Sequence, residues 1–113
     1  MTLILGIDPG SRATGFGIIE SVGNRLKYVG SGCIRPTLGE HPQRLKEIFR
    51  GICDVIEQYS PQECAIEEVF LGKSVSSALK LGQARGSAMV ACLHLDLPVA
   101  EYTPRTVKQS VTG

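Results

Sequence analysis

The sequence of 113 residues predicts an α/β protein in which a mixed β-sheet is flanked by helices. Two apolar strings that each end in an acid, LILGID and CAIE, are typical of buried strands. Between them, residues 45–59 repeat apolar side chains at helical spacing. The expected order of elements is β-β-β-α-β-α-β-α.

The first three predicted strands are residues 3–8, 14–20 and 25–34. Residues 3–8 form a nearly continuous apolar run that ends at Asp8, and the turn Pro9-Gly10 then reverses the chain. Gly23 and Asn24 supply the next turn. Because both connections are short, these strands are expected to form an antiparallel meander.

After the third strand, the spacing of the apolar residues changes to that of a helix. Residues 41–60 predict an amphipathic helix that stops at Pro61, and residues 62–69 predict a fourth strand with acids at its end. A second long helix is expected over residues 74–95 and a short strand over residues 98–102. Thr103 and Pro104 resemble the cap and first position of a further helix.

The second helix is apolar on nearly all sides after Arg85, so it should be buried on two sides. One side is expected to cover the sheet, and Gly82, Gly86 and Ala88 would permit close approach of another helix. That helix is interpreted as the same helix of a second subunit. The alternative is burial beneath a C-terminal part of the chain.

The composition excludes several classes of protein. A net charge of +1 argues against a globally basic nucleic-acid binder, and no apolar run reaches the ~20 residues of a membrane span. The N-terminus has no basic segment before its apolar run, so no signal peptide is expected. The four cysteines show no metal-ligand spacing. Reduced thiols in a cytoplasmic protein without membrane contact are the expectation.

One stretch carries charge of a single sign. Residues 69–95 contain no Asp or Glu but include Lys73, Lys80 and Arg85. This pattern suggests a local surface for phosphate groups. A solvated helix face is the alternative interpretation.

The candidate chemistry depends on Asp8 and Glu67, which end two predicted strands. If these strands are adjacent and parallel, the two carboxylates lie side by side and need a cation. Mg²⁺ prefers such oxygen ligands, and two ions about 3.5–4 Å apart would stabilise both oxygens of a phosphoryl transfer. The alternative for Asp8 is an Asx-turn residue that organises the following turn. Glu68 should face the other side of the sheet.

The strings GIDPGSRATGFGIIE, SGCIRP, AIEEVF and SALKLGQARG together resemble RuvC, the family of bacterial Holliday-junction resolvases. The resemblance covers essentially all 113 residues. It implies a ribonuclease-H-like fold, a homodimer, and Mg²⁺-dependent cutting of two strands of a four-way DNA junction, with Mn²⁺ as the other candidate ion. A branch-migration helicase complex is the implied protein partner.

The same resemblance implies roles for individual residues. Asp8 and Glu67 become metal ligands, Phe70 an aromatic that contacts bases near the crossover, and Lys108 a basic residue beside the scissile phosphate. From the sequence alone, Phe70 is equally a core residue or a platform on which an unpaired base stacks, and Lys108 is an ordinary helix-surface lysine. Together with Lys73, Lys80 and Arg85 they form the expected site.

The sequence departs from the family pattern in one respect. The family has two more acids on a C-terminal helix, whereas no Asp or Glu follows Glu101 here. The expectation is a single nuclease domain, residues 1–113, that lacks the final helix and has lost cleavage in this form. A junction-binding dimer without catalysis is the alternative function. An actin-like phosphotransferase is a third, for which 113 residues leave no room for the second domain.

Overall fold

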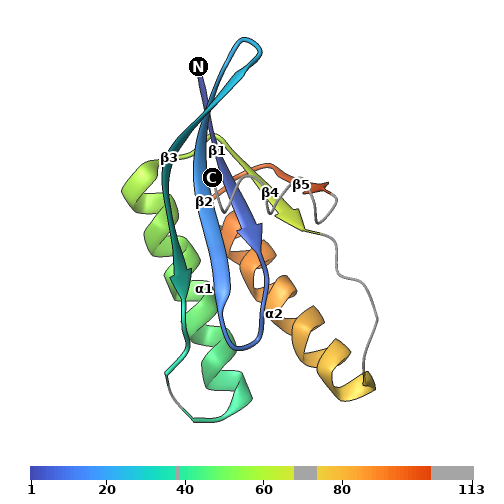
Figure 1. Cartoon of the computed structure of the whole chain (residues 1–113). Helices are drawn as coiled ribbons and strands as arrows, with labels where there is room; N and C mark the ends of the chain where they lie inside the picture. Colours follow the sequence, from blue (N-terminus) through green and yellow to red (C-terminus); the bar gives the residue numbers. More distant parts are fainter. Residues whose placement is uncertain (38, 68–73, 103–113) are drawn as a thin grey trace.

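The computed structural model describes residues 1–37, 39–67 and 74–102 (Figure 1). Its elements in chain order are β1 (Thr2–Asp8), β2 (Thr14–Val22), β3 (Arg25–Ile34), α1 (His41–Tyr59), β4 (Glu63–Glu67), α2 (Val75–His94) and β5 (Val99–Tyr102). The strand order in the sheet is β3-β2-β1-β4-β5. The first three strands form the expected antiparallel meander, and β4 and β5 add to β1 in parallel. The helix expected from Thr103 lies outside the described residues.

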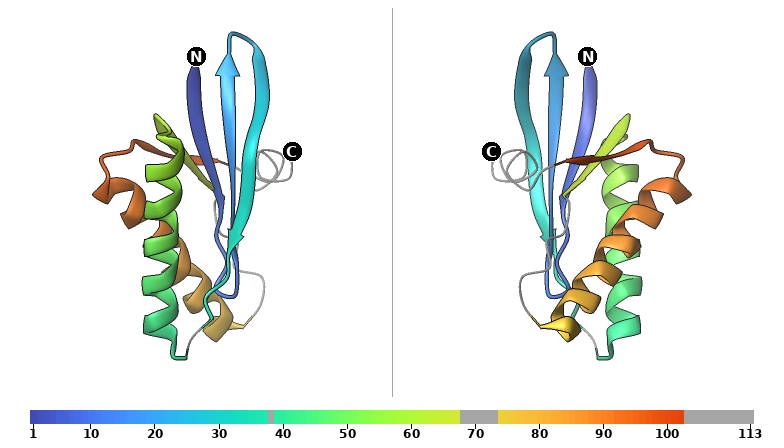
Figure 2. Two further views of the ribbon diagram at one scale, coloured as in Figure 1. Left: turned by 90° about the vertical axis from the view of Figure 1, so that its left-hand side faces the viewer. Right: turned by 90° about the vertical axis from the view of Figure 1, so that its right-hand side faces the viewer.

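Both described helices lie on the same side of the sheet, as the two views of Figure 2 show. The core fills the space between the helices and the sheet. Its fully buried members include Leu5 and Ile7 of β1, Ile48 and Ile52 of α1, and Ile66 of β4. The sheet is flanked by helices as expected, and the two described helices cover one face of it. The turn after β1 and the N-terminal turns of α1 and α2 meet at one edge of the molecule.

Helix α1 agrees with the predicted helix to within one residue. Its buried face repeats at the predicted spacing, through Ile48, Ile52, Val55 and Ile56. The helix ends at Tyr59 because Ser60 adopts a left-handed conformation, with φ of 50°, and its N–H donates to the carbonyl oxygen of Ile56 at 2.8 Å.

Helix α2 starts after Ser74, whose hydroxyl accepts a hydrogen bond from the N–H of Ser77 at 3.2 Å. Its buried face consists of Ala84, Ala88, Ala91 and Cys92. The opposite face is also apolar but lies open among the described residues, and it is formed by Val75, Leu79, Gly82, Gly86, Val90 and Leu93. We call these six residues the α2 stripe.

The α2 stripe corrects one expectation. Ala88 belongs to the core face and not to the face with Gly82 and Gly86, because it follows Gly86 by two residues and so points nearly the opposite way. The described residues bury one side of the helix, and burial of the other side by a second subunit or a C-terminal part of the chain stays a prediction. Neither α1 nor α2 is long and apolar enough to cross a membrane.

Candidate active site

Asp8 and Glu67 lie at the carboxyl ends of neighbouring parallel strands. The register of β1 on β4 pairs Gly6 with Ala65 and Ile7 with Ile66, so the next step sets Asp8 beside Glu67. Paired strands run about 4.8 Å apart, and directly paired residues point to the same face. The expected placement of the two strand ends at one edge of the sheet is therefore confirmed.

The two carboxylates differ in their surroundings. Glu67 is only 8% exposed and its Oε2 atom is fully buried, whereas Asp8 is half-buried. The main chain at Glu67 is fixed by α2, because Arg85 Nε donates to the Glu67 carbonyl oxygen at 3.2 Å. Placing two acids side by side at such a site favours a bound cation, since neighbouring carboxylates repel each other when both are ionised.

The donor set fits a divalent cation. Carboxylate oxygens are the ligands that Mg²⁺ prefers, and Mg²⁺ is commonly held by one or two carboxylates together with waters and substrate phosphates. Within the part of the chain that the structure describes, no group of three or more His, Cys, Asp or Glu side chains gathers around one point. A cation here would depend on Asp8 and Glu67 alone among these residues.

The turn after β1 is organised by Thr14 and not by Asp8. The buried Thr14 hydroxyl donates to the carbonyl oxygen of Gly10 at 2.9 Å and accepts from the Gly10 N–H at 3.3 Å. A Cβ atom on Gly10 would collide with the carbonyl oxygen of Ala13, so the loop is tight as well as bonded. The hydrogen bonds of Thr14 therefore hold this turn, for which an Asx-turn at Asp8 was the alternative explanation. Asp8 forms no ion pair with Arg12.

The structure describes only some of the remaining predicted site residues. Lys80 is exposed on α2, and Arg85 is half-buried on the same helix with its hydrogen bond to the end of β4. Phe70, Lys73 and Lys108 lie outside the described residues, so their roles stay predictions.

Two arginines that the sequence did not single out lie close to Lys80. Arg12 follows β1 and Arg44 is on the first turns of α1, and both line one pocket with Lys80. Nothing in the local sequence could have grouped them, because residue 12 lies in the turn after β1, residue 44 on α1 and residue 80 on α2.

Comparison with known proteins identifies the family. A family model described as crossover junction endodeoxyribonuclease RuvC matches residues 4–113. Proteins of that name from Photobacterium profundum and Histophilus somni are 61% and 57% identical to the whole chain. The solved structure of Thermus thermophilus RuvC in complex with a Holliday junction substrate superposes with a TM-score of 0.82 at 25% identity, covering 96% of this chain and 69% of that one.

The coverage of these relatives is partial. The chain spans 65% of the Photobacterium protein and 60% of the Histophilus protein. Over that span the match is continuous from the first strand to residue 113, and the fold agrees with the solved Thermus structure. On this evidence the chain belongs to the RuvC family of crossover junction endodeoxyribonucleases.

Proposed function

We propose that this chain carries the nuclease site of an Mg²⁺-dependent endonuclease that resolves four-way DNA junctions by paired strand nicks, in recombination and repair. The observation that carries the proposal is the pair of strand-end carboxylates, Asp8 and Glu67, on adjacent parallel strands. Membership of a family named for crossover junction cleavage supports the substrate, and so does a relative solved with a Holliday junction.

In this proposal Asp8 and Glu67 hold the metal, with two ions in the complete site and Mn²⁺ as the other candidate. Bound Mg²⁺ would supply the charge that activates a water and stabilises the leaving oxygen. The chain's own residues then position the substrate. Lys108 is proposed beside the scissile phosphate, and Phe70 as a platform for a base near the crossover, worth about 1–3 kcal/mol of stacking. Lys73, Lys80 and Arg85 are proposed to contact DNA.

We propose that a second copy of the chain packs against the α2 stripe. Four large apolar side chains flank two glycines with open space above them, at successive intervals of three or four residues along one helix face. Glycines at such positions allow two helix backbones to approach closely. A twofold contact through this stripe would set two active sites in symmetric positions, as paired nicks in a symmetric junction require.

We further propose that the protein acts on DNA in the cytoplasm beside a branch-migration helicase complex. The support is the family alone, since a resolvase needs a mobile junction brought to its cleavage site.

The catalytic proposal is tested by nicking of a synthetic four-way junction in Mg²⁺. The assay compares the chain itself with a fusion that adds the portion of the Photobacterium protein that this chain does not span. Asp8→Asn and Glu67→Gln should each lower the cleavage rate of the more active form by at least ~10²-fold, as loss of a group that stabilises the transition state does. Asp54→Asn, at an exposed acid of α1, is the matched control and should cleave normally.

Junction binding is measured on the same variants by gel shift. Loss of cleavage with retained binding supports the assignment of the two acids, whereas full cleavage by Asp8→Asn contradicts it. Binding without cleavage in both the chain and the fusion would favour the alternative, a junction-binding dimer without catalysis.

The dimer is tested by sedimentation with a matched pair of substitutions. Leu79 in the α2 stripe is 62% exposed and Leu26 on β3 is 69% exposed, so Leu→Glu disturbs the described fold little at either position. Leu79→Glu should shift the protein to monomer at micromolar concentration, because a buried unpaired charge is costly. Leu26→Glu should sediment as the unmodified chain does. A monomeric unmodified chain and fusion would refute the proposed dimer.

A further inference from the structure

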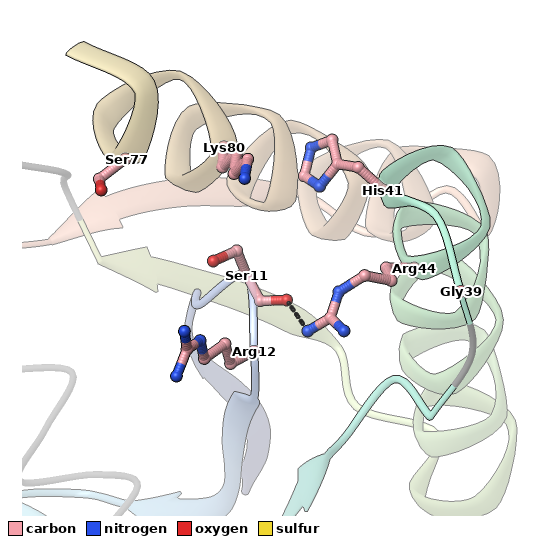
Figure 3. A pocket seen from close by; sticks show the side chains of 7 residues that line it. All are labelled: Ser11, Arg12, Gly39, His41, Arg44, Ser77 and Lys80. Atoms are coloured by element: carbon pink, nitrogen blue, oxygen red, sulfur yellow. Dashed lines mark hydrogen bonds between the residues drawn. The ribbon is translucent and has the colours of Figure 1, made fainter. Parts of the chain in front are cut away.

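A basic pocket lies where the turn after β1 meets the N-terminal turns of both helices (Figure 3). Its volume is about 370 Å³. The residues that line it are Ser11, Arg12, Gly39, His41, Arg44, Ser77 and Lys80. In Figure 3, the Arg44 side chain extends from α1 toward the turn that carries Ser11 and Arg12, whereas the His41 ring extends toward α2.

The charge of this pocket has one sign. Arg12 lies in the turn after β1, Arg44 on α1 and Lys80 on α2. Among the described residues, no carboxylate lines the pocket and none of the three cations forms an ion pair. The acid nearest in sequence to the lining, Glu40, is exposed. Like charges held together repel one another, so such an arrangement is typical of a site that receives an anion.

Parts of the pocket are held in place. Arg44 Nη2 donates to the carbonyl oxygen of Ser11 at 3.0 Å, which ties α1 to the turn and leaves the other guanidinium N–H groups for a ligand. His41 Nε2 is hydrogen-bonded to Gln83 Oε1 at 2.6 Å, which ties the start of α1 to α2.

The N-terminal ends of α1 and α2 also favour the binding of an anion in this pocket. Neither α1 nor α2 has an acid in its first turn, and the cap residue of α1, Glu40, makes no side-chain capping bond. A helix N-terminus carries partial positive charge, so basic residues there are unfavourable unless an anion is bound. Two such termini, three cations and the hydroxyls of Ser11 and Ser77 match the donors that recognise phosphate.

We infer that this pocket binds a phosphate group of the DNA backbone, on the strand that passes the carboxylates. The inference deepens the proposed function and rests on it for the identity of the polymer. Ser11 follows Asp8 by three residues, so their Cα atoms are at most about 11 Å apart. One strand can therefore occupy both places, and the pocket would fix the register of the phosphate presented for cleavage.

The first test measures junction binding without metal, as a function of salt. Arg12→Gln and Lys80→Gln change exposed side chains, so the fold should persist, and urea unfolding checks this. The double variant should bind more weakly and should lose about one unit from the slope of log K against log salt for the phosphate contact removed. Arg25→Gln with Lys27→Gln, at exposed residues of β3, removes the same charge and should leave the slope unchanged.

The second test locates the phosphate. Junctions that carry one neutral methylphosphonate linkage at successive positions are titrated against the unmodified chain and the Arg12→Gln/Lys80→Gln variant. One linkage near the cleavage site should weaken binding of the unmodified chain several-fold and have no further effect on the variant. Additive effects at every position would overturn the inference, as would a variant that binds with the unmodified affinity and slope.

A third test measures the thermal stability of the protein in inorganic phosphate at constant ionic strength. Under the inference, millimolar phosphate gives little thermal stabilisation, because the pocket depends on the rest of the DNA strand for affinity. Stabilisation at micromolar phosphate that the double variant abolishes, with junction binding unaffected, would assign the pocket to a free anion instead. Because all three arms measure binding, they remain interpretable even if Asp8→Asn cleaves normally and the catalytic proposal fails.

Discussion

Replacing Thr14 by Val tests whether one buried hydroxyl holds the turn that joins Asp8 to the basic pocket. Thr14 is fully buried, and its hydroxyl forms both a donor and an acceptor bond with Gly10, at 2.9 and 3.3 Å. Valine has nearly the same shape but cannot form either bond. The variant therefore isolates the hydrogen bonds from the packing.

The magnitude follows from these two bonds. A hydrogen bond contributes about 0.5–1.5 kcal/mol net, and a buried group left without its partner costs about 1–3 kcal/mol. Because the 3.3 Å bond is long and the Gly10 end is only partly buried, we expect Thr14→Val to lower the free energy of unfolding by about 2 kcal/mol. Thr14→Ser keeps the hydroxyl and loses one buried methyl group, at a cost of about 1 kcal/mol.

Urea unfolding of the two variants gives the comparison, and junction binding at low salt gives the functional readout. The Val variant should be the less stable of the pair by about 1 kcal/mol and should bind junctions more weakly, because the same turn carries Ser11 and Arg12. The Ser variant should bind normally. A Val variant as stable as the Ser variant, or one with unchanged binding, would refute the role assigned to the hydroxyl.

Three further predictions concern packing, pH and metal. Gly51→Ala should lower the free energy of unfolding by about 1 kcal/mol in urea titrations, because a Cβ would lie 2.8 Å from three carbons of Ile34; Ile34→Val in the same chain should recover part of the loss. The hydrogen bond to Cys92, followed by burial, raises the pKa of the Cys64 thiol, so the unfolded chain releases this proton first as pH rises. Stability should therefore fall above the ordinary thiol pKa of about 8.5, and Cys64→Ala should reduce that slope by about 1.4 kcal/mol per pH unit. Chelation of divalent ions should abolish junction cleavage and leave gel-shift binding intact, whereas cleavage in excess chelator would contradict a metal-dependent site.

Much of the fold was predictable because its patterns are local. The strand predicted after the turn at Gly23 and Asn24 has the bounds observed for β3, and the apolar spacing of α1 predicted its start and, within one residue, its end. The strand-end acids were also predictable, because an apolar run that ends in Asp8 or Glu67 is unusual unless the acid has a partner.

The rest depends on tertiary arrangement. The sequence of α2 is apolar on both faces, so hydropathy could not decide that Ala88 faces the core while Leu79 and Val90 stay open. The pocket is formed by Arg12, Arg44 and Lys80 only because the turn and two helix starts meet at one edge. The stretch without acids, residues 69–95, includes Lys80 but neither Arg12 nor Arg44, so the charge pattern of the sequence indicated only one of the three cations.

The parallel pairing of β1 with β4 also has a consequence for the order of folding. The meander of β1, β2 and β3 and the helix α1 are built from contacts between neighbours in sequence, whereas the pair Asp8 and Glu67 requires β4 to return across α1 to the first strand. Contacts between such distant segments form slowly, because the chain must first lose the entropy of a long loop. During synthesis, therefore, the meander can be complete while the two carboxylates are still apart, and the nascent chain acquires its paired acids only when β4 has left the ribosome and docked.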